Sequence, residues 1–126
     1  MFRQRRMMSR IALVAAGLVA ALALAAPIGA TSSVTKLTGT VGPGFTITLK
    51  KGTAKVKTLK AGTYKITVND KSNIHDFHLS GPGVNKVITA VGFKGTKTVT
   101  VKLKKGTYRY VCDPHATSMK GSFRVT

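Results

Sequence analysis

The sequence has few acidic residues and a single cysteine. Its 126 residues include only three carboxylate side chains (Asp70, Asp76 and Asp113), one cysteine (Cys112) and no tryptophan. Three carboxylates leave little from which to build a catalytic acid, and no nucleophile–base pair is visible, so we expect that the chain is not an enzyme. A single cysteine cannot form an internal disulfide, which leaves an intermolecular bridge, a reactive thiol, a buried apolar residue or a metal ligand.

The sequence after residue 30 also lacks sustained helical periodicity. Short segments that alternate between apolar and polar residues are separated by Gly and Pro turns instead. The expected strands lie at residues 37–41, 45–49, 56–59, 64–68, 74–79 and 96–103, in a segment starting at residue 106, and at 120–125, whereas residues 84–93 form a long connection with room for one short strand. Seven or eight short strands predict an all-β fold, an antiparallel β-sandwich.

The first thirty residues differ in composition from the rest. Four arginines precede an apolar run from Ile11 to Ala26, and the small residues Gly29 and Ala30 follow. This order is typical of a helical secretory signal peptide. We expect residues 1–30 to be cleaved after Ala30, with Ala25 as the second choice, and residues 31–126 to form one exported domain that is periplasmic, cell-surface or secreted. An uncleaved membrane anchor is the alternative, because residues 11–28 nearly reach spanning length.

The predicted exported part is strongly basic. It carries 17 lysines and arginines against the three carboxylates, a net charge of +14, and 15 of the 17 are lysines. Lysines such as Lys55, Lys57, Lys102 and Lys104 alternate with other residues along predicted strands, so we expect a solvated outer face. No aromatic platform or arginine cluster accompanies them, so nucleic-acid binding is not expected. The charge favours an acidic protein partner or association with an anionic cell envelope or membrane surface.

The stretch with the most distinctive chemistry lies near the end of the chain. Cys112, His115 and Met119 fall within eight residues of one another, directly after a predicted strand. A thiolate, an imidazole and a thioether together suit copper, and two histidines, one cysteine and a weak axial methionine form the blue-copper arrangement. A site of this kind needs a second histidine from elsewhere in the chain.

Only His75 and His78 remain as candidates for that second histidine. Because side chains alternate along a strand, His75 shares a face with the apolar Phe77, whereas His78 shares the other face with Asp76. Phe77 must point to the core, so His75 is predicted to point inward at one end of the sandwich, with His78 and Asp76 on the solvent side. The same alternation places Cys112 at the inward end of its own strand. We therefore predict His75 as the ligand.

These residues resemble the cupredoxins, in particular the plastocyanin, amicyanin and pseudoazurin group. The segment from Gly106 through the cysteine to the last strand is similar to that family's ligand loop, and residues 75–79, HDFHL, are similar to its first-histidine segment. The resemblance covers essentially all of residues 31–126. It implies a Greek-key β-sandwich with one type 1 copper ion, bound by His75, Cys112, His115 and Met119, that carries single electrons between redox partners.

Three features depart from the family pattern. Three residues separate His115 from Met119, whereas plastocyanin has four and amicyanin two. Asp76 replaces the usual asparagine after the first ligand, and Asp113 stands where relatives often have serine or threonine. We expect both carboxylates to lie beside the ligands, with Asp76 either altering the hydrogen bonds that orient the ligand loop or hydrated, and Pro114 to stiffen the turn between two ligands.

Together these observations predict a monomeric electron carrier. The resemblance implies that electrons pass through a partly exposed His115, that Pro114 and Ala116 form a small apolar docking rim, and that lysine-rich flanks steer an acidic redox partner. A copper chaperone or scavenger using the same ligands is the alternative. A cell-surface structural sandwich would leave the intact ligand set unexplained, and a multicopper enzyme would need more than three histidines.

Overall fold

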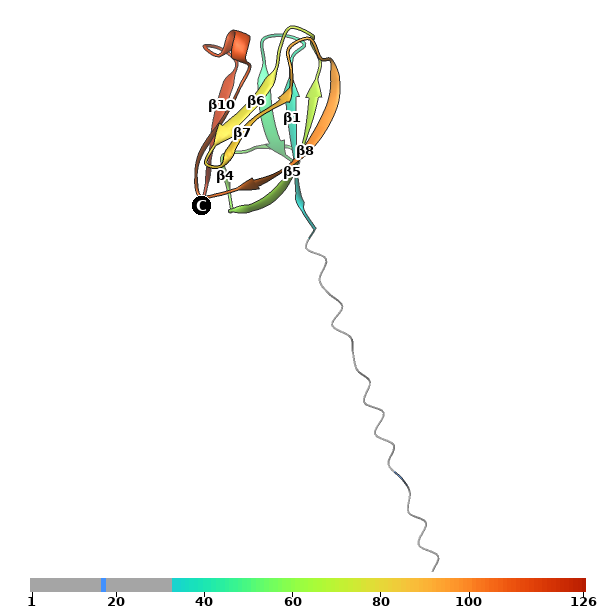
Figure 1. Ribbon diagram of the computed structural model, residues 1–126, viewed down its shortest axis with the longest axis vertical. Helices are drawn as coiled ribbons and strands as arrows, with labels where there is room; N and C mark the ends of the chain where they lie inside the picture. Colours follow the sequence, from blue (N-terminus) through green and yellow to red (C-terminus); the bar gives the residue numbers. More distant parts are fainter. Residues whose placement is uncertain (1–16, 18–32) are drawn as a thin grey trace, which may run out of the picture. The chain divides into compact units, whose positions relative to one another are not determined.

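The computed structural model describes residue 17 and residues 33–126 (Figure 1). The predicted signal peptide, residues 1–30, lies outside the described residues except for Gly17. The elements of the described part follow one another as β1 (Thr35–Val41), β2 (Ile47–Lys51), β3 (Ala54–Lys55), β4 (Thr58–Leu59), β5 (Gly62–Asp70), β6 (Phe77–Gly81), β7 (Val84–Thr89), β8 (Gly95–Leu103), β9 (Gly106–Val111), the short 3-10 helix η1 (Asp113–His115) and β10 (Lys120–Val125).

The strands form two five-stranded sheets that enclose one core. One sheet has the order β3-β2-β1-β5-β8 and the other the order β4-β10-β9-β6-β7. The predicted β-sandwich is therefore confirmed. The pairing differs in one respect from the antiparallel expectation, because β1 pairs with β5 and β4 with β10 in parallel, while the other six pairs between described strands are antiparallel. Apolar alternation indicates which face of a strand is buried, but it does not indicate the direction of the neighbouring strand.

The core follows the predicted alternation. Tyr64 and Ile66 of β5 are buried, as are Tyr108 and Tyr110 of β9, and the residues between them are exposed. The ring of Tyr110 stacks on that of Phe77 from β6, with the ring centroids 5.7 Å apart. This aromatic pair buries a large apolar area and holds β6 and β9 together next to the predicted ligands.

The predicted lysine face is also confirmed. Lys55, Lys57, Lys102 and Lys104 are all exposed. Their alternation with buried residues such as Val56 places the charged side chains outward and leaves the apolar positions for the core.

Three strands begin later than predicted, and one ambiguous segment is a strand. The strand predicted at residues 56–59 is the two-residue β4, which begins at Thr58. β2 begins at Ile47 and not at Phe45, because the bend that follows Gly42 continues through Phe45. β6 begins at Phe77 and not at Ile74, so the predicted ligand segment before it is a loop. Residues Val84–Thr89 form the edge strand β7, which pairs only with β6.

The strand register defines the two ends of the sandwich. At one end, which we call the base, Thr35 of β1 lies beside Tyr64 near the start of β5, and Gly106 of β9 lies beside Val125 of β10. At the opposite end β1 finishes at Val41, β9 leads into η1, and β6 begins. All residues of the predicted copper site lie at that opposite end (Figure 1).

Candidate metal centre

Three of the four predicted ligands bring their donor atoms to one point. The Nδ1 atoms of His75 and His115 lie 3.1 Å apart, and the Sγ atom of Cys112 lies 3.6 Å from each of them. Among the described residues these three form the only cluster of histidine, cysteine and carboxylate donors that could hold a metal ion, with all donor atoms within 4.8 Å of one another. His75 and Cys112 are fully buried, whereas His115 is partly exposed.

His75 is held by the loop that leads into β6. It directly precedes Asp76 and the strand, and its side chain is 0% exposed. The backbone of Gly42 passes close to the ring, because a Cβ atom at Gly42 would lie 3.3 Å from Cδ2 of His75. Gly42 has φ +71°, a conformation that a residue with a side chain rarely adopts, so glycine is required both for the turn and for this close approach.

The other three predicted ligands belong to one short loop between β9 and β10. The backbone N–H of Cys112 donates to the carbonyl of Met119 at 3.0 Å, and the N–H of His115 donates to the carbonyl of Cys112 at 3.0 Å. The N–H of Met119 donates back to the carbonyl of His115 at 2.8 Å. Pro114 lies in the first turn of η1, where its fixed φ suits the helical backbone. These hydrogen bonds and the proline fix the spacing of the three side chains.

The donor set fits copper. One thiolate and two imidazoles suit copper, and the fully buried Met119 adds a thioether in the same loop. Burial raises the pKa of the Cys112 thiol, so a thiolate at this position needs a counter-charge. The Nε2 atom of His75 is buried and has no hydrogen-bond partner among the described residues, while its Nδ1 faces the other donors. Copper bound at this point supplies a one-electron couple between Cu(I) and Cu(II).

Asp76 is buried, and the prediction that it faces solvent is wrong. Its side chain is 3% exposed, because Asp76 precedes β6 and does not follow the alternation of that strand. Its backbone N–H donates to Sγ of Cys112 at 3.5 Å, and its Oδ1 accepts the N–H of Asp113 at 2.6 Å. The carboxylate therefore ties the first-histidine segment to the ligand loop. Burial, with a smaller effect of the neighbouring Asp113 carboxyl group, raises the pKa of Asp76 to about 6.

His78 lies outside the donor cluster and makes other contacts. Its Nδ1 lies 2.9 Å from Oδ2 of Asp113, and its Nε2 lies 2.5 Å from Oδ1 of Asn85. The hydrogen bonds to Asn85 and then to Asp113 raise the pKa of His78. Hydrogen bonds from Asp76 and then from His78 lower the pKa of Asp113. His78 thus holds the start of η1 against the sheet from the outer side.

Phe45 is the site residue that the sequence analysis missed. Its side chain is 62% exposed, and its ring packs edge-on against His115, with centroids 4.9 Å apart, and against His75, with centroids 5.4 Å apart. The residues Gly42, Pro43 and Gly44 immediately before it are the signal that could have placed it in a bend and not in a strand. Phe45 covers the edges of both imidazoles.

Comparison with known proteins gives the family. Residues 30–126 match the family of copper binding proteins called the plastocyanin/azurin family. The chain belongs to this family. It is therefore a cupredoxin, as the resemblance implied. A comparison with curated proteins found no significant match.

Solved structures share this fold. A rusticyanin variant with a methionine-to-glutamine substitution is 26% identical, with 72% of this chain and 76% of that chain covered and a TM-score of 0.52. Another structure of the copper protein rusticyanin is 23% identical over the same shares, with a TM-score of 0.52. A chain from a heme-copper terminal oxidase dimer is 21% identical, with 72% of this chain and 63% of that chain covered and a TM-score of 0.51. The last two show the fold alone.

The family and the donor cluster together define the cofactor. This cupredoxin has the arrangement of His75, Cys112, His115 and Met119 that is typical of a single type 1 copper site, and it is an electron-transfer protein of that kind. Cupredoxins are electron carriers, generally not enzymes, and are typically extracytoplasmic. In the part of the chain that the structure describes, no helix is long and apolar enough to cross a membrane.

Proposed function

We propose that this cupredoxin carries single electrons between extracytoplasmic redox partners, and that each partner docks at the end of the sandwich that holds His115. The different exposure of the three donor residues supports this proposal. The donor atoms converge in a site in which His75 and Cys112 are fully buried and His115 alone is partly exposed. The imidazole of His115 is then the shortest path from the interior of the site to a partner on the surface.

The protein's own hydrogen bonds hold the ligand positions, which supports rapid electron transfer. The loop hydrogen bonds among Cys112, His115 and Met119, and the contact from Asp76 to Asp113, hold the donors from both sides. A site that keeps one geometry in both oxidation states needs little rearrangement for each electron transferred. The protein's contribution is therefore the rigidity of the two segments that carry the ligands.

The surface around His115 fits a transient partner. Phe45, Pro114 and Ala116 are exposed beside the imidazole and present a small apolar area. A small apolar contact supports docking that is specific but short-lived, as repeated electron transfer requires. The docking rim therefore includes Phe45 in addition to the two loop residues that the sequence analysis named.

Charge around the same end supports an acidic partner. Lys71 follows β5, Lys94 precedes β8 and Lys120 begins β10, and all three are exposed at the end of the sandwich that holds the ligands. Lysines outside the apolar contact raise the association rate with an oppositely charged protein and contribute little to the affinity of the docked complex. We call Lys71, Lys94 and Lys120 the rim lysines.

The burial of the sulfur ligand disfavours a copper chaperone. A chaperone passes its ion to another protein by ligand exchange, which requires that the incoming ligand reach the metal. Cys112 and Met119 are both 0% exposed, and Phe45 covers the edges of the imidazoles. Slow copper exchange is expected from this arrangement, and slow exchange suits a retained redox cofactor.

The proposal is tested by electron-transfer kinetics of the copper-loaded protein with an acidic and a basic redox protein as partners. The expected rate with the acidic partner falls as salt is added, because exposed charges are screened over about 8–10 Å at physiological ionic strength. A variant in which the rim lysines are changed to glutamine should react several-fold more slowly. The control changes Lys36, Lys60 and Lys104, which are exposed at the base, opposite the end that holds His115, and should react at the wild-type rate.

Two results would overturn the proposal. One is the absence of a reversible one-electron wave in voltammetry of the copper-loaded protein. The other is transfer of copper to a chelator within seconds together with no electron transfer to either partner, which would favour copper handling. Equal effects of the rim and control variants would leave electron transfer in place but would remove the acidic docking partner.

A further inference from the structure

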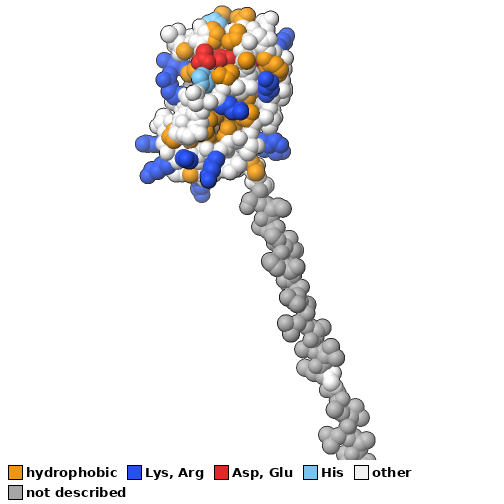
Figure 2. All heavy atoms as spheres, viewed as in Figure 1, with side chains coloured by type: hydrophobic (Ala, Val, Ile, Leu, Met, Phe, Trp, Pro, Cys, Tyr) orange, Lys and Arg blue, Asp and Glu red, His pale blue; other side chains and the backbone are white. Residues whose placement is uncertain are grey.

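The negatively charged side chains are confined to one end of the sandwich, whereas exposed lysines lie at both ends. All three carboxylate side chains lie at the ligand end. Asp70 is the last residue of β5 and pairs with Gly95, and Asp76 and Asp113 flank the ligands. Figure 2 shows the acidic side chains close to a histidine in the upper part of the domain and lysines along the lower edge. Among the described residues no acidic side chain lies at the base.

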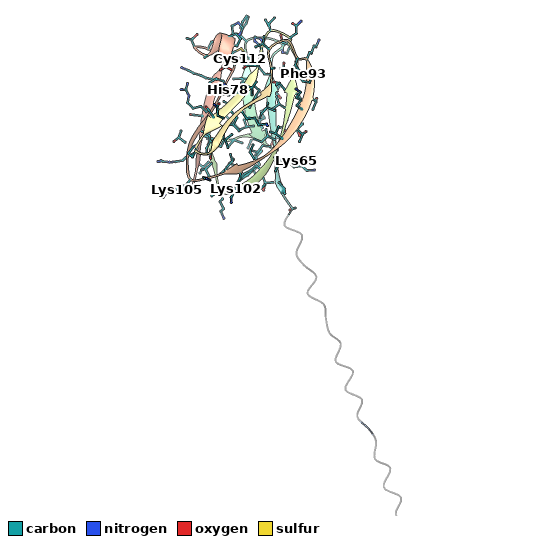
Figure 3. All side chains as sticks on the ribbon, viewed as in Figure 1. Lys65, His78, Phe93, Lys102, Lys105 and Cys112 are labelled. Carbon is teal, nitrogen blue, oxygen red and sulfur yellow. The ribbon has the colours of Figure 1, made fainter. Side chains whose placement is uncertain are left out.

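The base itself carries a set of exposed lysines. They come from the start of β1, the turn between β4 and β5, the end of β8 and the turn between β8 and β9. Figure 3 labels two of them, Lys102 and Lys105, near the lower edge of the domain, and Cys112 near the upper edge. We call these five residues the basal lysines: Lys36, Lys60, Lys102, Lys104 and Lys105. They are distinct from the rim lysines, and redox docking beside His115 leaves them unused.

A cleft at the base has a composition that suits an anionic headgroup. It has a volume of about 530 Å³, and its lining includes Lys51 and Lys60 together with the hydroxyl-bearing side chains of Thr35, Thr58 and Thr63. No carboxylate side chain lines it. Ammonium groups and hydroxyls are donors to phosphate oxygens, and lysine binds phosphate as a compact charge with rotatable donors.

The polypeptide also enters the domain at the base. β1 begins at Thr35, only seven residues after the end of the possible anchor segment at residues 11–28. Seven residues of extended chain span at most about 25 Å. In the alternative to cleavage, in which this segment stays in the bilayer as an anchor, the chain tethers the base within this distance of the lipid surface. This favours a lipid surface over a soluble anionic polymer as the occupant of the base.

We propose that the base docks on the anionic phospholipid surface of a membrane. The basal lysines contact the headgroups, the cleft beside Lys60 accepts a headgroup phosphate, and the opposite end with His115 faces away from the bilayer. A lysine near an anionic leaflet strengthens binding by about five-fold, and the attraction decays within a Debye length. The docked molecule has one orientation, because the carboxylates at the ligand end offset the charge of the rim lysines and make that end less attracted to the surface.

The first measurement is the binding of the protein to lipid vesicles. The protein is expressed from the full sequence and used as the cells produce it, with its N-terminal segment retained or removed. Flotation with vesicles of phosphatidylcholine alone is compared with flotation with vesicles containing one quarter phosphatidylglycerol. The test variant changes Lys60, Lys104 and Lys105 to glutamine, and the control variant changes Lys50, Lys55 and Lys97. The extra binding to anionic vesicles should fall by about a hundred-fold in the test variant and much less in the control.

The second measurement reads the orientation directly in the wild-type protein. Lysines are acetylated with and without anionic vesicles, and the modification at each position is measured by mass spectrometry. We expect protection of Lys60, Lys104 and Lys105 by the vesicles and none at Lys71, Lys94 and Lys120. Neither measurement depends on copper or on electron transfer, so failure of this proposal would leave the proposed function intact.

Several outcomes would overturn the proposal. Equal loss of binding in the test and control variants would mean that total charge alone drives adsorption. Uniform acetylation with vesicles, or preferential protection of the rim lysines, would exclude docking through the base. Protection of the basal lysines by soluble polyglutamate but not by vesicles would assign the base to an acidic polymer and not to a membrane.

Discussion

His75 and His115 lie 40 positions apart in the chain, yet their Nδ1 atoms are 3.1 Å apart. His75 is carried by the loop before β6, and His115 by η1 after β9, and β6 and β9 are neighbours in one sheet. The pairing of these strands therefore fixes the distance between the two imidazoles. The sulfur of Cys112 completes the cluster because Cys112 directly follows β9 and precedes η1, which carries His115.

The ring of Phe45 is expected to slow copper loss. Its edge-on contacts with His75 and His115 are each of a kind that contributes roughly 0.5–1.5 kcal/mol. In the variant Phe45→Ala, removal of copper by an excess of chelator should be about 2- to 10-fold faster. Unfolding of the metal-free protein should change little, because Phe45 is 62% exposed.

The matched control for Phe45 is Val87→Ala, in the edge strand β7. Val87 is an exposed apolar residue like Phe45, with 46% of its surface accessible, but it has no ring that could pack on the ligands. Chelator kinetics of this variant should equal those of the wild type. An unchanged rate in Phe45→Ala as well would contradict the shielding role of the ring.

The buried carboxyl group of Asp76 should make the metal-free protein less stable as the pH rises. Its pKa is about 6 in the folded state, compared with 3.8 for an ordinary aspartate, so the folded state binds the proton more tightly than the unfolded state does. Its stabilising contribution is therefore complete below about pH 4 and is lost as the pH rises to about 6. The free energy of unfolding should fall across this window by roughly 2–3 kcal/mol more in the wild type than in Asp76→Asn.

Urea unfolding of the metal-free wild type and of Asp76→Asn at pH 4, 5, 6 and 7 measures this difference. The asparagine retains an oxygen that can accept the N–H of Asp113, so the tether to the ligand loop is kept. Parallel pH dependence in the two proteins would show that Asp76 does not titrate in this range. Bound copper should reduce the difference, because a nearby cation favours the ionised carboxylate.

The contact between Gly121 and Tyr110 tests the packing of the sheet that carries the ligand loop. A Cβ atom at Gly121 would overlap the ring of Tyr110, which is 1% exposed and cannot move outward. Gly121→Ala should therefore lower the free energy of unfolding by about 1–3 kcal/mol. Gly44→Ala is the control, because a Cβ there meets nothing within 4 Å, and it should change the stability by a few tenths of a kcal/mol at most. Chemical denaturation of both variants decides the point, and equal stabilities would contradict the packing described.

The strands and the three converging ligands, His75, Cys112 and His115, could be predicted from the sequence, because both depend on local sequence pattern. Period-two alternation places Tyr108, Tyr110 and Cys112 on one face, and the structure buries all three. The same rule predicted an inward His75, which is buried although the strand begins only at Phe77. The prediction succeeded here because the loop before β6 continues toward the core.

The failures occurred where the chain leaves regular strand geometry. Alternation assigned Asp76 to solvent, but the residue lies in a loop, and a hydrogen bond from Asp113 offsets part of the cost of burial. Alternation also assigned Phe45 to a strand, whereas a bend after Gly42 brings it over the imidazoles. β7 was ambiguous because an edge strand with mostly exposed residues carries a weak apolar pattern. The binding surfaces for partners could not be predicted from the sequence, because their charged residues come from distant segments that only the strand register brings together.

The type 1 copper site is tested most directly by adding Cu(II) to the metal-free protein and recording visible absorption and electron paramagnetic resonance. The same is done for Cys112→Ser and for His78→Ala, whose histidine lies outside the donor cluster. We expect an intense blue charge-transfer band with a type 1 resonance signal that disappears in Cys112→Ser and persists in His78→Ala. Weak copper binding without such a band in the wild type, or loss of the band in His78→Ala, would contradict the site described here.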